Sequence, residues 1–511
     1  MPLRFRSRAA VPAALPPAEL LESRRLLAGV TVTTADDLND GDTSSIANLL
    51  ANPGPSGISL REAIAAANNT PGADVVNFNI PGAGPHTVQL GSTLPFITDT
   101  LTINGYTQPG AVANTLALGN NATIKIELRA GSTVGLGLNL RAPNCEIRGL
   151  SMTGFDFLTA DFAAAILLRA PGAIVEGNWI GVRPDGTVSG NTRGIRGTDE
   201  APGALVGGTT PAARNVISGN LVAGVDLEGA GSSVVGNYIG TTISGTGAAP
   251  NGAGVFINGS HITVGGAGIG ARNVISGNNE DGVRARGEGH KIEGNFIGPG
   301  ANGEPLGNGG DGVRLLSPLV SDRIIRVGSE KDPFNAPVIA HNSGHGVNIA
   351  QGNAAVGQVA IHNNGGEGIK LGNAGFGSLT LTSATTTPAG TVITGTISGV
   401  QPGDGFVVTF YGNTEAGEHE AAIGSGFFQA DTNGIVNINA TIPACGLPRI
   451  SAIADRDELA DFGTSLSAVS LPIANNRPPV IEITTTAGSG AGSIVAAFSA
   501  AATTPGPAVL L

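Results

Sequence analysis

Three side chains capable of acid–base chemistry recur at the same place in a short repeated phrase. Asp281, Asp311 and His345 each stand directly before a glycine that is followed by valine. Neighbouring strands of a sheet lie about 4.8 Å apart, so stacked repeats would place the two carboxylates side by side. Retaining glycoside hydrolysis needs such a close carboxyl pair, with one group as acid and the other as nucleophile. The pattern makes a polysaccharide hydrolase one candidate function.

The same residues also have a purely structural interpretation, because polar side chains are common at solvated corners. Arg284 and Arg314 follow Asp281 and Asp311 by three positions and could neutralise them. Ion pairs of this kind at a surface contribute only about 0–1 kcal/mol. We therefore expect a chain without catalytic activity and keep the enzyme as an alternative.

Aromatic residues recur at a second place in the repeat. Trp179, Tyr238 and Phe296 each follow Gly-Asn and precede isoleucine. If these rings faced outward they could stack on sugars, and the chain would be a carbohydrate-binding module that does not cleave its ligand. Filling of space between the coils is the interpretation that we favour for them.

An internal repeat of about 30 residues must position all of these side chains. Its inward positions include Val225, Val255, Val283, Val313 and Val347, and most copies carry a second apolar residue two positions later. This spacing of two residues indicates strands rather than helices. Each such side chain stabilises the fold by about 1.5–3 kcal/mol when stacking buries it.

An asparagine precedes each repeated glycine by three or four positions. The column consists of Asn191, Asn220, Asn251, Asn278, Asn308, Asn342 and Asn364. Stacked asparagines can bond their amides from one coil to the next and tolerate the backbone of a sharp corner. The sequence therefore predicts an asparagine ladder.

These patterns predict an all-β chain whose centre is a right-handed, single-stranded parallel β-helix over residues 130–375. Longer alternating strands follow, such as 391–396 and 406–411, and predict an Ig-like β-sandwich over 376–474. Residues 475–511 are expected to form a linker and a flexible tail.

A short helix is expected to cap the amino-terminal end of the β-helix, within residues 29–129. Ser59 and Glu62 have the spacing of a capping box, and apolar residues follow on one helical face. Such a helix would cover the open edge of the first coil. The acidic run Asp36–Asp42 could bind Ca²⁺, but a turn is the favoured interpretation, so we expect no cofactor.

The composition limits the kinds of molecule that the chain is expected to bind. The 511 residues include 80 glycines and carry a net charge of −12, without a basic stripe, so nucleic acid is not an expected partner. No apolar run is long enough for a transmembrane span.

Cys145 and Cys445 are too far apart to indicate a disulfide framework. Residues 1–28, which begin with three spaced arginines, are expected to be an export leader.

Two amino-terminal segments resemble parts of known exported proteins. Residues 19–28 resemble the Leu-Glu-Pro-Arg-x-Leu-Leu segment of large exported proteins of planctomycete-type bacteria, with Ser23 in place of the proline. Residues 29–110, with the phrase SLREAIAAAN, resemble the CSLREA-type domain of bacterial surface proteins. Ile58 replaces the cysteine that gives this domain its name. The resemblance implies a secreted or cell-surface protein.

The central repeat resembles the parallel β-helix repeat of pectin-active enzymes with the pectin lyase-like fold, of tailspikes and of adhesins. The resemblance implies the fold; for the function we expect an adhesin-like stalk or glycan-contacting scaffold, with extracellular polysaccharide or other surface proteins as partners. Residues 344–346 and 368–370 are similar to the Gly-His-Gly and Arg-Ile-Lys motifs of polygalacturonases, whose other motifs are not matched. Arg141-Ala-Pro143 fits part of a pectate lyase motif but reappears at Arg169 one coil later. A hydrolase or a lyase remains the alternative.

Overall fold

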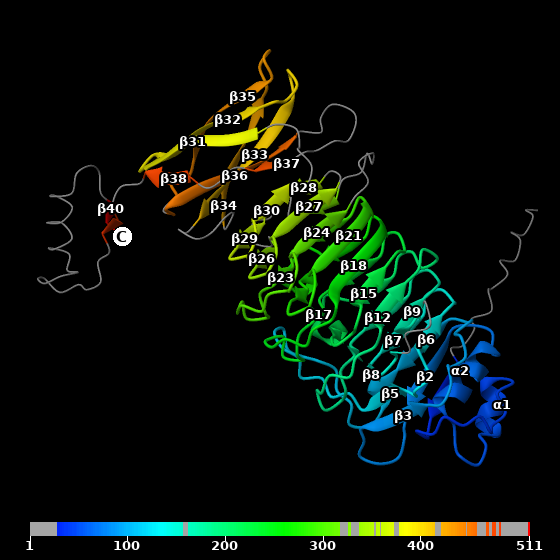
Figure 1. Ribbon diagram of the computed structural model, residues 1–511. Coiled ribbons are helices and arrows are strands. Elements are labelled where there is room, and N and C mark those ends of the chain that lie inside the picture. Colours follow the sequence, from blue (N-terminus) through cyan, green and yellow to red (C-terminus); the bar gives the residue numbers. More distant parts are fainter. Residues whose placement is uncertain are drawn as a thin grey trace, which may run out of the picture.

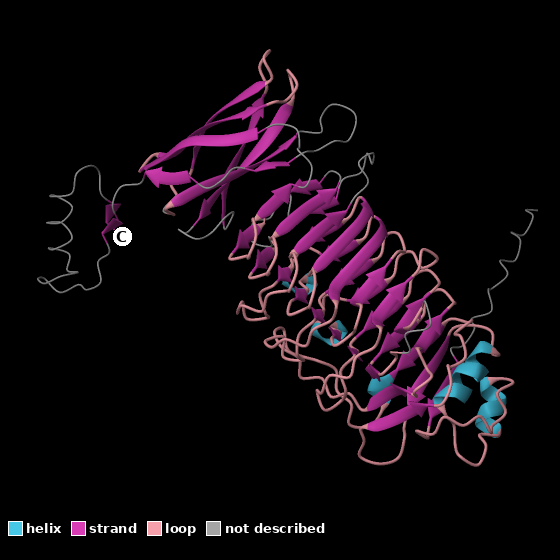
Figure 2. Cartoon of the chain, viewed as in Figure 1, coloured by secondary structure: helices cyan, strands magenta, loops and turns pink. Residues whose placement is uncertain are grey.

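The computed structural model describes residues 28–156, 162–316, 325–328, 337–351, 354–357, 359–371, 378–413, 421–445, 447–456, 467–469, 473–476, 480–481 and 509–510. The predicted leader, apart from Ala28, and most of the predicted tail lie outside these residues. The described chain is all-β with few helices, and three large parallel sheets run along its elongated body (Figure 1 and Figure 2).

Each parallel sheet takes one strand from nearly every turn of the chain. Sheet A contains β1 (Ala28–Val32), β2 (Asp74–Phe78), β4 (Leu101–Asn104), β7 (Glu146–Arg148), β10 (Ile174–Glu176), β13 (Leu205–Gly207), β16 (Ser233–Val235), β19 (Thr263–Gly265), β22 (Lys291–Glu293), β25 (Ile325–Val327) and β28 (Ala354–Val356). Sheet B contains β3 (His86–Leu90), β5 (Ile126–Ala130), β8 (Leu150–Thr153), β11 (Trp179–Ile180), β14 (Val216–Ile217), β17 (Tyr238–Ile239), β20 (Val274–Ile275), β23 (Phe296–Ile297), β26 (Val338–Ala340) and β29 (Ala360–His362). Sheet C contains β6 (Leu136–Leu140), β9 (Ala164–Leu168), β12 (Arg193–Gly197), β15 (Ala223–Leu227), β18 (Ala253–Ser260), β21 (Val283–Glu288), β24 (Val313–Leu316), β27 (Val347–Gln351) and β30 (Ile369–Leu371).

The order of the strands shows how the chain builds this body. From β7 to β30 the chain enters sheets A, B and C in strict rotation, and every strand from β7 to β27 pairs in parallel with the strand three places later. Each rotation therefore adds one strand to all three sheets. The arrangement is compatible with a parallel β-helix.

The predicted inward column of sheet C lies in register along the whole body. Its members are Ile195, Val225, Val255, Val283, Val313, Val347 and Ile369. All of them are buried in one continuous core that also receives apolar side chains from sheets A and B. No single coil could bury these residues alone, so each depends on its neighbours.

The glycine before each inward valine is required by close packing between coils. A Cβ atom on Gly254 would lie 2.5 Å from the carbonyl oxygen of Gly282 and 2.6 Å from Cγ2 of Ile275. The equivalent glycines of the other coils face the same obstruction. Only glycine lets the backbone pass here, which explains why the Gly-Val phrase recurs.

The asparagine column forms an unbroken chain of hydrogen bonds at the corner between sheets B and C. Nδ2 of Asn191 donates to Oδ1 of Asn220 at 2.8 Å, and the same bond continues coil by coil to Asn364. From Asn220 onward each Oδ1 also accepts from the backbone N–H of the preceding asparagine, and Oδ1 of Asn191 accepts from the Phe155 N–H. The amides thus fix the spacing and register of seven corners.

A second asparagine ladder lies at the corner between sheets A and B. It runs through Asn178, Asn215, Asn237, Asn273 and Asn295, all fully buried, with side-chain bonds of 2.8 to 3.3 Å. This ladder was not expected from the sequence. The recurring Gly-Asn-aromatic-Ile and Arg-Asn-Val-Ile phrases were its signal.

Two helices cover the first coil, where one was expected. Helix α1 (Ile46–Ala51) and helix α2 (Leu60–Asn68) pack on β1 and β2 at the end of the body (Figure 2). In α2 the Ser59 hydroxyl accepts from the Glu62 N–H, and the Glu62 side chain accepts from the Ser59 N–H, which is a complete capping box. The other carboxylate oxygen of Glu62 accepts from Asp40 and Gly41 N–H groups, so this buried charge is satisfied. Short 3₁₀ turns are η1 (Gly105–Thr107), η2 (Pro211–Ala213) and η3 (Ile269–Ala271).

The carboxy-terminal unit is a mixed sheet of longer strands. Its order is β34 (Ala421–Gln429), β33 (Gly405–Asn413), β36 (Arg449–Arg456), β38 (Ile473–Asn476), β31 (Ser378–Thr387), β32 (Gly390–Ser398) and β35 (Ile435–Ile442), with β37 (Ser467–Val469) beside β36. The end strands β34 and β35 lie close together, so the path nearly closes on itself. This pairing does not confirm the Ig-like sandwich. A separate pair, β39 (Val480–Ile481) and β40 (Val509–Leu510), follows.

The carboxy-terminal unit touches the last coil through Tyr411. This ring is fully buried within the core of the parallel body, and its hydroxyl donates to the carbonyl oxygen of Gly357 at 2.9 Å. Each end of the apolar core is therefore covered, by helices at one end and by a tyrosine at the other.

Replacing Asn251 tests the first ladder. Asn251→Ala removes the amide between Asn220 and Asn278, so the buried Asn220 N–H loses its acceptor and Asn220 Nδ2 loses its shortest bond, at about 1–3 kcal/mol per group. We expect the free energy of unfolding in urea to fall by about 3 kcal/mol. Asn302→Ala, at an exposed turn, is the matched control and should change it little. Equal stability of the two variants would contradict the structural role of the ladder.

Candidate functional site

The three candidate catalytic residues lie next to one another on the outer side of sheet C, where they form a ladder of their own. Oδ1 of Asp281 accepts from the backbone N–H of Asp311 at 2.9 Å, and Oδ1 of Asp311 accepts from the N–H of His345 at 2.8 Å. Nδ1 of His345 in turn accepts from the N–H of Glu367. The expected proximity is present, but each side chain bonds the backbone of the next coil.

The second oxygen of each carboxylate also has a donor. Oδ2 of Asp281 accepts from Arg284 at 2.9 Å, as the sequence suggested. Oδ2 of Asp311 accepts from the Asn348 amide at 2.7 Å, in the place expected for Arg314. A general acid or a nucleophile needs a carboxylate oxygen within reach of the substrate, but both oxygens of each carboxylate here accept bonds from the fold. This environment suits structural carboxylates better than an acid–nucleophile pair.

The aromatic candidates lie on the outer side of sheet B, where residues 108–125 cover them. Trp179 and Tyr238 are only 3% and 2% exposed, and both belong to a small apolar cluster with Ile124. The N–H of Gly119 donates to the Tyr238 hydroxyl, and Arg214 stacks on the same ring. Neither ring has the free face that binding of a sugar would require.

Phe296, the third aromatic candidate, is half-buried at the edge of the same cluster. Arg272 lies over its ring at 4.2 Å and donates to the carbonyl oxygen of Gly294. The sequence did not indicate the cover over sheet B, because residues 108–125 carry no copy of the repeat. Contacts between segments so far apart appear only in the folded chain.

The acidic run Asp36–Asp42 is engaged in local bonds. Asp37 forms a two-bond ion pair with Arg61, and Asp42 accepts from the Ser44 hydroxyl and N–H. Within the described ranges, no three His, Cys, Asp or Glu side chains gather closely enough to hold a metal ion.

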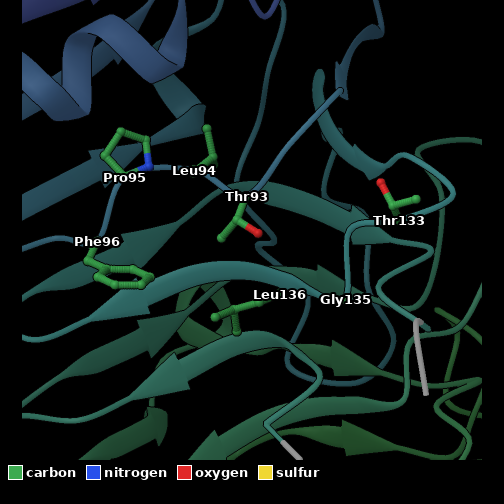
Figure 3. Close-up of a pocket in the computed structure, with 7 residues that line it drawn as sticks. All are labelled: Thr93, Leu94, Pro95, Phe96, Thr133, Gly135 and Leu136. Atoms are coloured by element: carbon green, nitrogen blue, oxygen red, sulfur yellow. The ribbon is translucent and has the colours of Figure 1, made fainter. Parts of the chain in front are cut away.

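A hollow near the amino-terminal end of sheet C is a site that the sequence did not reveal. The hollow has a volume of about 620 Å³ and is lined by Thr93, Leu94, Pro95, Phe96, Thr133, Gly135 and Leu136 (Figure 3). Figure 3 shows Phe96 and Leu136 along its apolar part and the Thr93 and Thr133 side chains projecting beside it. We call this site the Phe96 hollow. Its lining comes from two segments about 40 residues apart, which successive turns bring together.

No family model matches the chain, and no curated protein matches it either. No described helix is long and apolar enough to cross a membrane.

Two buried titratable groups lie away from the sheet C column. Asp74, at the start of β2, is 3% exposed, and burial raises its pKa to about 6, with a further contribution from Asp99. His290 is fully buried; its Nδ1 accepts from the N–H of Ile262, and its Nε2 lies 2.7 Å from the carbonyl oxygen of Arg286. Burial holds the pKa of His290 below its ordinary value.

Asp74 should make the protein more stable as the pH falls from 7 to 5. Its folded-state pKa of about 6 exceeds the ordinary value of 3.8, so the folded form binds a proton first and gains stability on acidification. About 1.4 kcal/mol of this gain falls between pH 7 and 5, and the full effect of about 3 kcal/mol is reached only below pH 3.8. Asp74→Asn should flatten this part of the profile of unfolding free energy against pH. An unchanged slope would contradict the assignment.

His290 should make the protein less stable as the pH falls, in contrast to Asp74. Because its pKa is depressed in the folded state, the unfolded chain binds the proton more readily, and stability falls as the pH drops below about 6.5. His290→Gln keeps one donor and one acceptor but cannot titrate. We expect its melting temperature to lose less than the parent protein between pH 7.5 and 5. A variant as acid-sensitive as the parent would rule out His290 as the cause.

Proposed function

We propose that the chain is an exported surface or extracellular scaffold without catalytic activity, which works as an adhesin-like stalk and contacts glycans. The occupation of both oxygens of Asp281 and Asp311 by donors from the fold carries this proposal. Asp281 and Asp311 hold adjacent coils together through these bonds, so they are poor candidates for proton transfer to a substrate.

The proposal includes finer assignments of the fold. The three-sheet body would be a right-handed, single-stranded parallel β-helix with the pectin lyase-like fold, since parallel crossover connections are nearly always right-handed. The carboxy-terminal unit would be an Ig-like sandwich, because backbone pairing between the described strands links β31, β32 and β35 to β33, β34 and β36 through β38, whereas β34 and β35 are close but not paired. The SLREAIAAAN segment would be a CSLREA-type cap.

Export and surface location rest on the resemblance of residues 19–28 to leaders of planctomycete-type proteins. A stack held by two internal amide ladders suits an environment where a stalk must stay extended. Extracellular polysaccharide or other surface proteins would be its partners, and no cofactor is proposed. Protease accessibility on intact cells would test the location.

Incubation with polygalacturonate and a panel of acidic glycans tests whether the scaffold is an enzyme. We expect no release of reducing ends or unsaturated products, because the candidate carboxylates are committed to the backbone. We expect Asp311→Asn to lower the free energy of unfolding by about 1–3 kcal/mol through the weakened bonds to His345 and Asn348.

Circular dichroism would show whether that variant remains folded, and Asp185→Asn, at an exposed turn, is its control. Sustained product release by the parent protein, abolished in folded Asp311→Asn and retained in the control, would overturn the proposal in favour of a polysaccharide hydrolase. Release of unsaturated products would favour a lyase.

A further inference from the structure

We propose that the Phe96 hollow binds one sugar residue of an acidic polysaccharide, with Arg141 holding the sugar carboxylate. This inference rests on the proposed function and names the class of glycan that the scaffold contacts. Its volume of about 620 Å³ lies within the range of sites for small ligands.

The lining of the hollow matches the two kinds of surface on a sugar ring. Leu94, Pro95, Phe96 and Leu136 offer apolar contact for C–H groups, and the Thr93 and Thr133 hydroxyls offer hydrogen bonds (Figure 3). Phe96 is 41% exposed, unlike the covered rings over sheet B.

A cation lies against one of the lining residues, Phe96. The guanidinium carbon of Arg141 lies 3.9 Å from the centre of the Phe96 ring. Among the described residues no carboxylate pairs with Arg141, which is exposed. A stacked guanidinium keeps its planar donors free for two parallel bonds to a carboxylate.

The next coil repeats this combination and provides a place for a second sugar residue. Arg169 occupies the position of Arg141 one coil later, because each follows the paired residues Leu168 and Leu140. Its guanidinium lies 4.8 Å from the ring of Phe162, which is 39% exposed. Coils lie about 4.8 Å apart, so the two arginines can meet successive charges of one extended chain.

The capping helix α2 holds the hollow in shape. Arg61 donates to the carbonyl oxygens of Ser92 and Thr93 while Asp37 fixes its guanidinium. At the other end of the segment, the Asn68 amide donates to the carbonyl oxygen of Phe96 at 2.7 Å. The site therefore exists before a ligand arrives, which lowers the entropic cost of binding. Arg61 and Asn68 are positioning residues.

An acidic glycan fits these features better than an acidic peptide. The net charge of −12 repels polyanions in general, so binding must come from local contacts rather than from long-range attraction. Flexible acidic peptides offer carboxylates but no rigid ring with a C–H face for Phe96.

Affinity electrophoresis of the full chain through gels containing polygalacturonate, neutral galactan or polyaspartate tests the proposal. We expect retardation by polygalacturonate alone. Arg141→Gln and Phe96→Ala should each weaken it about tenfold, which is about 1.4 kcal/mol. Arg286→Gln is the matched control: this exposed arginine also stands over a phenylalanine, Phe256 at 5.8 Å, but several coils away from the hollow. Its binding should equal that of the parent protein.

Several outcomes would overturn the inference. They are absence of retardation by polygalacturonate, equal retardation by galactan or polyaspartate, and equal loss of binding in Arg286→Gln. Arg141 is exposed, so its replacement leaves folding intact, which circular dichroism would verify. These results can be distinguished from failure of the proposed function. Lost retardation would contradict binding at the Phe96 hollow, whereas released products would contradict a scaffold without catalytic activity.

Discussion

Register between successive coils is the constraint on which the rest of this molecule depends. A single coil is too thin to bury its own valines, and only in-register stacking of Val225, Val255 and Val283 makes them a core. Two asparagine ladders hold that register at two of the three corners. A buried amide that lost its neighbour would carry an unsatisfied polar group, so a shift of register is penalised at every coil that the ladders join.

The same constraint explains where polar side chains are used. The column of Asp281, Asp311 and His345 has the spacing of a catalytic pair because the coils themselves have that spacing, and its atoms bond to the next coil. In a repeat built this way, adjacency of like residues is a consequence of the fold and is weak evidence for chemistry. Exposed groups without such duties, such as Arg141, are the better functional candidates.

The two ends of the stack are where the repeat meets other structures. At the first coil, one helix both covers the core and fixes the segment that lines the Phe96 hollow, through Arg61 and Asn68. At the last coil, Tyr411 of the carboxy-terminal unit enters the core. Capping and the shaping of a surface site are thus carried out by the same short element at the amino-terminal end.

Sequence alone determined the parallel strands, their inward valines, the first asparagine ladder and the capping box, because each of these repeats locally or depends on neighbours within a few residues. The second ladder was not predicted, because the recurring Gly-Asn-aromatic-Ile phrase was interpreted as a strand with an aromatic residue and its asparagine was not treated separately. Helix α1, the cover over sheet B and the Phe96 hollow could be found only in the tertiary structure. They arise where segments without the repeat cross coils, and no periodic signal records which side chains meet there.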